Sequence, residues 1–249
     1  MLKKLLKFFF EDDNLRAISY YRLYSLLLQW AKDRRKPYSY ELPNGISFPE
    51  DFWKNIVNLY HLTDTNGNER AVSVFWADGD LIFSTITEGN EKMVKSNSQV
   101  KITYTPKPNN NQYYTKEVFV DGKRYLTKEI YYKNLPQKID ITYLFNIHTH
   151  PAHSLNGQKQ YGIFSAQDIK SFVNSNALIT GLIRDDFTLL FKTTKSIAMA
   201  EHLKDQDITE QTLTNKYGFV LYNGRFNQKL FKILSELEQR ESATNKEKE

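Results

Sequence analysis

Residues Ile139–Ser175, with the sequence IDITYLFNIHTHPAHSLNGQKQYGIFSAQDIKSFVNS, carry the strongest structural signals in this chain. The run Ile139–Ile147 is rich in β-branched and aromatic residues, and this composition predicts a buried strand. The run Ser165–Ser175 predicts a helix with Ser165 as its N-cap. Three of the five histidines of the chain lie between these two elements: His148, His150 and His153.

The spacing of these polar residues predicts a metal site. Side chains alternate across a strand, so His148 and His150 should point the same way and converge just past the strand end. Imidazole is the commonest metal ligand, and a catalytic zinc takes three protein ligands and keeps one position for water. Asp168, in the first turn of the following helix, is the candidate third ligand. Ser165 could donate a hydrogen bond into the same site, and His153 is interpreted as a loop residue.

The pattern His-x-His-Pro followed by Ser-x-x-Asp resembles the signature of the JAMM (MPN-plus, or JAB) family of zinc metallopeptidases. It reads HTHP at residues 148–151 and SAQD at residues 165–168, and the resemblance covers the chain from about residue 60 to about 195. It implies that His148, His150 and Asp168 ligate Zn²⁺. It also implies that Ser165 helps to hold the oxygen that becomes negative in the tetrahedral intermediate.

The family also has a glutamate that acts as general base at the start of the first strand of an early hairpin. Glu69 holds that place in NERAVSVFWADGDLIF, and Glu88, after the second strand, is the alternative. The chain departs from the family pattern after the glutamate, where Val72, Val74 and Trp76 replace the usual glycine-rich residues. The insertions 90–138 and 152–164 are also long, and we expect them to affect substrate binding.

The rest of the chain predicts an alternation of helices and strands. Helices are expected at Leu15–Trp30, capped by Asp12 or Asp13, and at Phe48–Tyr60, near 197–204 and at Phe226–Gln239. Strands are expected at Ala71–Ala77, Leu81–Thr87, 177–185, 187–194 and near Phe219–Tyr222, with a further hairpin at Glu117–Tyr132. Asp78-Gly79, Asp121-Gly122 and Asp185-Asp186 are turn signals, and polar, Asn-rich residues 90–115 predict an irregular loop.

These signals predict an α+β (α/β) fold with a JAB/MPN-like mixed β-sheet flanked by helices. We expect a helical N-terminal extension over residues 1–60, a metallopeptidase domain over 61–200 and a helical C-terminal extension over 201–249. The last residues, ESATNKEKE, are expected to fray.

The composition of the chain argues against several other classes of protein. The chain has 249 residues, 40% of them hydrophobic, and a formal charge of +5. It has no cysteine, which excludes disulfides, cysteine-ligated zinc and a cysteine nucleophile. No apolar run reaches the roughly 20 residues that span a bilayer. The basic and apolar start MLKKLLKFFF lacks a signal-peptide cleavage site, so we expect a cytoplasmic protein.

Three hypotheses follow for function. The first is a zinc-dependent peptidase or isopeptidase whose substrate, by resemblance, is the C-terminal tail of a ubiquitin-like protein or its conjugate. The second is a JAB-fold binding or scaffold module, RadC-like and associated with nucleic acid through the basic run KDRRK, although nucleic-acid binding is not favoured. The third concerns residues 1–36, whose helices pack on the domain or dock a partner protein or membrane surface.

Overall fold

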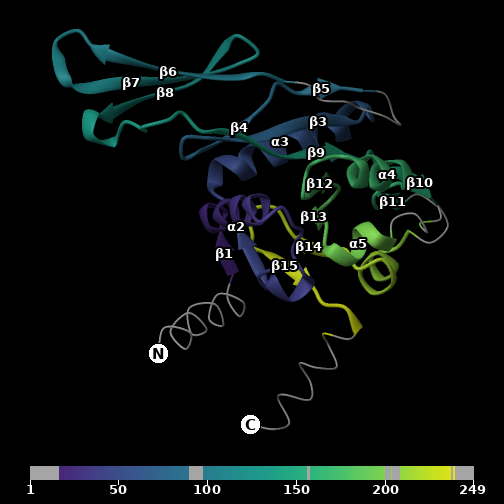
Figure 1. Ribbon diagram of the computed structural model, residues 1–249. Helices are drawn as coiled ribbons and strands as arrows, with labels where there is room; N and C mark the ends of the chain where they lie inside the picture. The colour runs from purple at the N-terminus through teal and green to yellow at the C-terminus, as the bar shows by residue number, and fades with distance from the viewer. Residues whose placement is uncertain are drawn as a thin grey trace, which may run out of the picture.

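A mixed ten-stranded β-sheet forms the centre of the computed structural model, which describes residues 17–89, 98–155, 158–199, 203, 208–236 and 238 (Figure 1). The order of its strands is β1-β2-β15-β14-β13-β12-β9-β3-β4, with β5 also paired to β3. Their bounds are β1 Ala17–Ser19, β2 Gly45–Ser47, β3 Arg70–Ala77, β4 Asp80–Phe83, β5 Thr87–Glu88, β9 Ile141–Thr149, β12 Ile179–Ile183, β13 Phe187–Phe191, β14 Val220–Gly224 and β15 Leu230–Ile233. The chain is therefore a mixed α+β protein.

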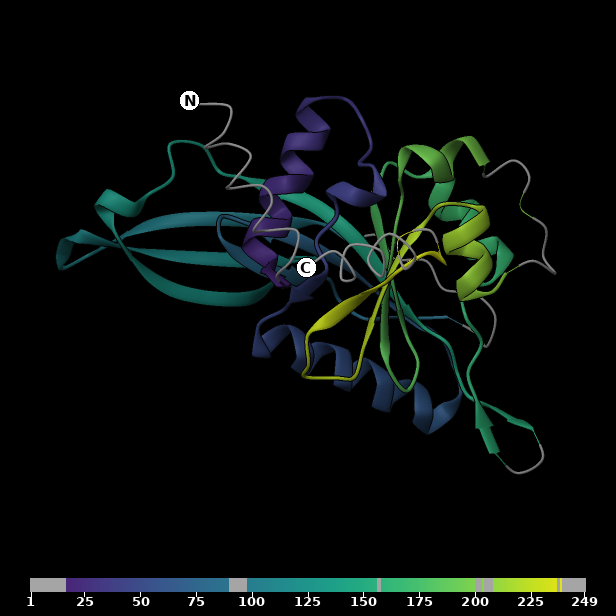
Figure 2. The same cartoon turned by 90° about the horizontal axis from the view of Figure 1, so that it is seen from below.

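Helices cover both faces of this sheet (Figures 1 and 2). The helices α2 (Tyr20–Lys32) and α3 (Glu50–Asn66) pack against one face, in a core that includes Val74, Ile147 and Leu189. The helix α4 (Ala166–Asn174) packs against the other face, in a core that includes Leu182, Leu190 and Leu221. Neighbouring residues such as Leu189 and Leu190 enter different cores because side chains alternate across a strand.

The central strands and α4 confirm the local predictions. β9 and β12 are parallel, so the chain must cross over between them, and α4 lies in that crossover with Ser165 as its N-cap. β12 and β13 pair antiparallel around Asp185-Asp186, as expected. The strand expected near Phe219–Tyr222 is present as β14, and the helix expected near 197–204 begins earlier, as α5 (Thr194–Met199).

Both Asp-Gly signals produce tight hairpins. Asp78 and Gly79 have φ of 46° and 94° between β3 and β4, and Asp121 and Gly122 have φ of 51° and 78° between β7 (Asn110–Val120) and β8 (Lys123–Tyr131). Positive φ at both central residues matches the twist of a two-residue hairpin, and Asp and Gly tolerate it best. The prediction of these two hairpins is confirmed.

The prediction of an irregular loop over residues 90–115 is wrong where the structure describes them. β6 (Val100–Lys107) and the start of β7 occupy this region and form a separate three-stranded sheet with β8. Figures 1 and 2 show this sheet extending beyond the main sheet. Only its base is apolar, where Ile102, Val118 and Val120 pack on Ala77 and Ile82. Apart from the buried Lys116, the rest is exposed or half-buried, which explains its loop-like polar composition.

The terminal segments also differ from their predicted helices. Ala17–Ser19 is strand β1, and α2 begins only after Ser19, whose hydroxyl caps it; Asp12 and Asp13 lie outside the described residues. The expected helix Phe226–Gln239 is wrong, because Leu230–Ile233 is strand β15, paired with β14 and β2. The helix expected at Phe48–Tyr60 is present as α3 and continues to Asn66, where Gly67 ends it at a φ of 74°.

Strands from both flanking segments thus belong to the main sheet: β1 and β2 precede residue 60, and β14 and β15 follow residue 200. The domain boundaries at residues 60 and 200 stay a prediction. Within the part of the chain that the structure describes, no helix has the length and apolar character needed to cross a membrane.

Candidate metal centre

The three residues expected to bind metal, His148, His150 and Asp168, come together at the end of β9. His148 is the penultimate residue of β9, where it lies between Ala71 of β3 and Leu182 of β12. His150 follows the strand, and its backbone N–H donates to the carbonyl of Ile183 at 3.1 Å. The crossover then places the first turn of α4, with Asp168, above the same strand end.

The candidate ligand atoms of His148, His150 and Asp168 all lie within 4.8 Å of one another. His148 Nε2 is 3.5 Å from Asp168 Oδ1, and His150 Nε2 is 3.3 Å from Asp168 Oδ2. Two ligands that are each about 2.0–2.1 Å from a tetrahedral zinc are roughly 3.3 Å from each other. The spacing of these atoms therefore suits a zinc ion.

The hydrogen bonding of His148 supplies a second indication of fit. Its Nε2 atom is buried and has no hydrogen-bond partner among the described residues. A buried polar atom without a partner costs about 1–3 kcal/mol. A metal ion between His148 and Asp168 would remove that cost, because it would take the lone pair of this nitrogen.

The loop after β9 orients the second histidine. The carbonyl of Gly162 lies 3.2 Å from His150 Nδ1 and accepts a hydrogen bond from it. An imidazole that donates from Nδ1 has its lone pair on Nε2, the atom that faces Asp168. The adjacent residue Tyr161 contacts the hydroxyl of Tyr60 in α3 at 3.1 Å, and Lys159 pairs with Asp64 of α3 at 2.5 Å. Lys159 and Tyr161 of the insertion are therefore held against α3.

Ser165 and Asp168 form a reciprocal cap at the start of α4. Asp168 Oδ2 accepts hydrogen bonds from the backbone N–H and the hydroxyl of Ser165, both at 2.7 Å. The backbone N–H of Asp168 donates to Ser165 Oγ at 3.1 Å. This box holds the Asp168 carboxylate in place, so the helix cap and the metal-ligand orientation come from the same contacts.

His150 and the carboxylate of Asp168 stabilise each other's charged forms. Burial alone would raise the pKa of the Asp168 carboxyl, but the neighbouring His148 and His150 imidazoles and the Ser165 hydroxyl hold that pKa well below its usual range. Burial alone would lower the pKa of His150, but the carboxylates of Asp168 and Glu69 and the carbonyl of Gly162 together raise that pKa. Asp168 is therefore an anion at neutral pH, as a metal ligand must be.

Of the two candidate bases, Glu69 is the one that faces this cluster. It precedes β3, is 8% exposed, and has its Oε1 atom 3.9 Å from His150 Nε2. Burial raises the pKa of its carboxyl above the usual value. Glu88 lies apart and exposed, where its Oε1 accepts hydrogen bonds from the amide groups of Asn66 and Asn68.

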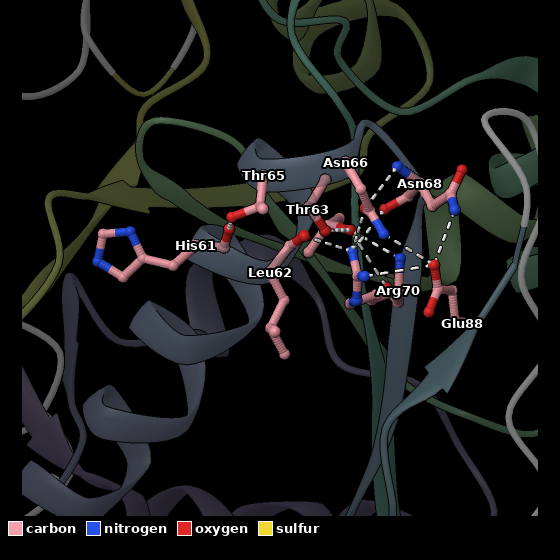
Figure 3. Close-up of polar contacts among 9 residues, drawn as sticks. His61, Leu62, Thr63, Thr65, Asn66, Asn68, Arg70 and Glu88 are labelled. Atoms are coloured by element: carbon pink, nitrogen blue, oxygen red, sulfur yellow. Dashed lines mark hydrogen bonds and ion pairs between the residues drawn. The ribbon is translucent and has the colours of Figure 1, made fainter.

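The sequence did not predict the role of Arg70, which follows Glu69 and anchors the start of β3 to the end of α3 (Figure 3). Its buried guanidinium donates to the carbonyls of Leu62 and Asn68 at 2.6 Å and 3.1 Å and to Asn66 Oδ1 at 3.0 Å, and it pairs with Glu88 at 3.3 Å. The arginine thus ties the last turn of α3 to the first residue of β3.

Thr149, the middle residue of HTHP, ties the same elements to β9. Its Oγ1 atom accepts a hydrogen bond from the Arg70 backbone N–H at 2.8 Å and contacts Thr63 Oγ1 at 2.6 Å. Thr149 is only 1% exposed, because side chains alternate along the strand and that of Thr149 points away from His148 and His150. The feature of the sequence that points to Thr149 is its position between the two expected metal ligands, His148 and His150.

The two other histidines that the structure describes, His61 and His153, are not part of the cluster. His153 begins β10 (His153–Leu155), which pairs with β11 (Gln158–Gln160) in a short hairpin. His61 is an exposed residue of α3, and its ring points away from Arg70 in Figure 3. His202 lies outside the described residues.

The fold and the site thus define a mixed α+β protein with a candidate two-histidine, one-carboxylate metal centre beside a buried glutamate. A scan against models of known protein families found no match, and neither did searches of curated proteins and of solved structures.

Proposed function

We propose that this chain is a zinc-dependent peptidase or isopeptidase of the JAMM type, with a JAB/MPN-like fold. The observation that carries the proposal is the convergence of His148, His150 and Asp168 from β9 and α4, with the buried Glu69 beside them. Three protein ligands leave one zinc position for water, which is the arrangement of catalytic rather than structural zinc. The HTHP and SAQD motifs and their resemblance to the family support the same reading.

A zinc ion held by these three ligands would lower the pKa of a water molecule to about 7 and polarise the substrate carbonyl. Glu69 would accept the proton of that water at a carboxylate oxygen and deliver it to the nitrogen of the leaving amine. Its raised pKa suits both steps, because a base that must later act as an acid works best with a pKa near the operating pH.

Ser165 has two proposed roles. Its hydroxyl holds Asp168 in the orientation needed for metal binding. The family resemblance adds an oxyanion role, in which the hydroxyl turns from Asp168 toward the substrate oxygen as charge develops there. The two roles predict different effects of mutation.

The proposed substrate is an amide bond at the C-terminus of a ubiquitin-like protein, or an isopeptide bond in its conjugate. Extended tails of this kind bind by adding a strand to a sheet edge. The strands that flank β3 on its outer side, β4 and β5, form the sheet edge nearest to Glu69 (Figure 1). We propose that the tail enters along this edge.

A cleavage assay on fusions of a panel of ubiquitin-like proteins tests this function. The wild-type chain should cleave at least one fusion, and Glu69→Gln should lower the rate by about 10²–10⁴-fold, the usual contribution of a general base. Glu88→Gln is the matched control and should leave the rate within about twofold, because the side-chain contacts of Glu88 with described residues are to Asn66, Asn68 and Arg70.

Two outcomes would count against the enzyme. If Glu88→Gln removes activity and Glu69→Gln does not, the assignment of the base is wrong. If the chain binds zinc and a ubiquitin-like protein but cleaves no fusion, a binding module of the same fold is the better account.

A further inference from the structure

A second candidate site lies at the other end of β9, away from the metal centre. A cavity of about 360 Å³ opens between the C-terminal half of α2, the start of β9 and the residues before β12. Its walls are mainly apolar, from Tyr24, Leu27, Trp30, Leu144 and Leu178. This volume falls within the range of about 300–1,000 Å³ that small-molecule sites occupy. An apolar cavity of this size suits a hydrocarbon group.

The rim of the cavity is basic. Arg34, Arg35 and Lys36 all line it. The charge of Arg35 is balanced, because its two terminal nitrogens donate to Glu41 at 2.6 Å and 2.7 Å. No acidic side chain in the described ranges pairs with Arg34 or Lys36. Among the described residues, Arg34 and Lys36 are therefore the two rim cations without an acidic partner.

A third cation, Lys192, is joined to the wall of the cavity through its backbone. Lys192 is 1% exposed, and its Nζ donates to the carbonyls of Ser175 and Val173 at 2.6 Å and 3.2 Å. Its backbone N–H donates to the carbonyl of Leu178, a residue of the cavity wall. Burial, together with the nearby charge of Lys36, lowers the pKa of this ammonium to about 8. Lys192 does not itself line the cavity.

The backbone of Arg34 ends α2 at the rim of the cavity. After α2, the N–H of Arg34 donates to the carbonyl of Ala31, and that of Arg35 donates to the carbonyl of Trp30. These two bonds form a Schellman motif, whose C′ position is left-handed and usually occupied by glycine. Arg34 occupies that position at a φ of 51°, a conformation that is unfavourable for a residue with a Cβ. The Schellman motif thus accounts for this conformation and places Arg34 at the rim of the cavity.

We propose that this cavity binds an amphipathic carboxylate, with its hydrocarbon chain between α2 and β9 and its carboxylate on Arg34 and Lys36. A guanidinium matches a carboxylate with two parallel hydrogen bonds. The apolar walls take the chain, since burial of hydrocarbon is favourable at each methylene. The site does not depend on the proposed zinc chemistry, because it lies at the opposite end of β9 from His148.

Isothermal titration calorimetry of the full-length chain with decanoate, below its micelle concentration, tests the proposal. Decanoate should bind one site per chain. Decanol, which has the same chain without the charge, should bind at least roughly tenfold more weakly. Ala31→Phe, which places a ring in the cavity, should remove binding.

The most discriminating variant is Arg34→Gly. Glycine adopts the left-handed conformation freely, so the melting temperature should stay equal or rise while decanoate affinity falls by roughly tenfold or more. Lys36→Gln should also weaken binding. Lys32→Gln is the charge-matched control, because Lys32 ends α2 two residues before Arg34 but does not line the cavity, and it should leave affinity unchanged.

Three results would overturn the proposal. One is no heat of binding for decanoate, and another is equal affinity for decanol and decanoate. The third is an equal loss of affinity in Arg34→Gly and Lys32→Gln, since that would show a non-specific charge effect. A concentration-dependent dimer that Ala31→Phe dissociates, without decanoate binding, would assign the face to a second copy of the chain instead.

Discussion

Ser165 makes a hydrogen bond to Asp168 with its hydroxyl and accepts one from the Asp168 backbone. Ser165→Ala removes both and should lower the free energy of unfolding by about 1 kcal/mol, the usual cost of losing an N-cap. It should also weaken zinc affinity, because Asp168 loses a contact that orients it. Ser165→Thr keeps a hydroxyl and should restore both properties.

The kinetic readout separates the two proposed roles of Ser165. If the serine only orients Asp168, saturating zinc should restore kcat in Ser165→Ala. If it also holds the oxyanion, kcat should stay about 10²–10³-fold low at saturating zinc. Normal zinc affinity in Ser165→Ala would contradict the orienting role.

At the same scale, the Arg35–Glu41 pair predicts a pH-dependent stability. Hydrogen bonds from Arg35 outweigh the effect of burial and hold the pKa of the Glu41 carboxyl below its usual value. A carboxyl whose pKa is lowered by folding stabilises the chain above its unfolded pKa, near 4.3, and loses that contribution as the pH falls through the folded pKa.

Glu41→Gln should therefore lower the free energy of unfolding at pH 7 by about 1 kcal/mol or less, since the pair is partly exposed. Urea denaturation at a series of pH values measures the difference between variant and wild type. The difference should shrink as the pH falls below about 4. A difference that is constant with pH would show that Glu41 acts by packing rather than by charge.

At the scale of elements, the hairpin β10–β11 should affect metal binding without contributing a ligand. Its return strand leads through Tyr161 to Gly162, whose carbonyl accepts from His150, and Tyr161 is held by Tyr60 of α3. Tyr161→Phe and Tyr60→Phe each remove one hydroxyl of that contact. Each should weaken zinc affinity several-fold, and competition with a fluorescent chelator measures it.

The double variant Tyr60→Phe/Tyr161→Phe should be no worse than either single variant, because both lose the same hydrogen bond. The control is Tyr40→Phe, which changes an exposed tyrosine far along the chain from the hairpin and should have no effect. Additive effects of the two single variants would contradict the proposed coupling.

The element β15 gives a test of the fold itself. Leu230 is fully buried and its neighbour Phe231 is 62% exposed, as alternation in a strand requires. Leu230→Ala should lower the free energy of unfolding by about 2–5 kcal/mol, and Phe231→Ala should change it by about 0.5 kcal/mol or less. Chemical denaturation of the two variants measures both. Similar effects at the two positions would contradict the strand.

At the scale of the whole molecule, the sequence predicts the parts of the fold that local signals control. Asp-Gly turns, the Ser165 cap and the apolar run before His148 identify the central hairpin, α4 and β9, and the fixed spacing of HTHP and SAQD identifies the residues of the candidate centre. These features depend on a few neighbouring residues, so one sequence is enough to reveal them.

The parts that were missed depend on residues far apart in the chain. Leu230–Ile233 has helical spacing with its neighbours, but pairing with β14 and β2 makes it a strand. β6 and β7 are polar because only the base of their sheet is buried. Arg70 is charged and sits beside Glu69, yet its importance comes from carbonyls of α3 that only the folded chain brings near it.

We propose that His148, His150 and Asp168 hold a catalytic zinc ion. The most direct test is the zinc content of the purified full-length chain, measured by mass spectrometry of the metal beside the His148→Ala/His150→Ala variant. We predict about one zinc per wild-type chain and almost none in the variant, with the fold of both checked by circular dichroism. Less than about half a zinc per wild-type chain after loading, or equal zinc in both proteins, would contradict the claim.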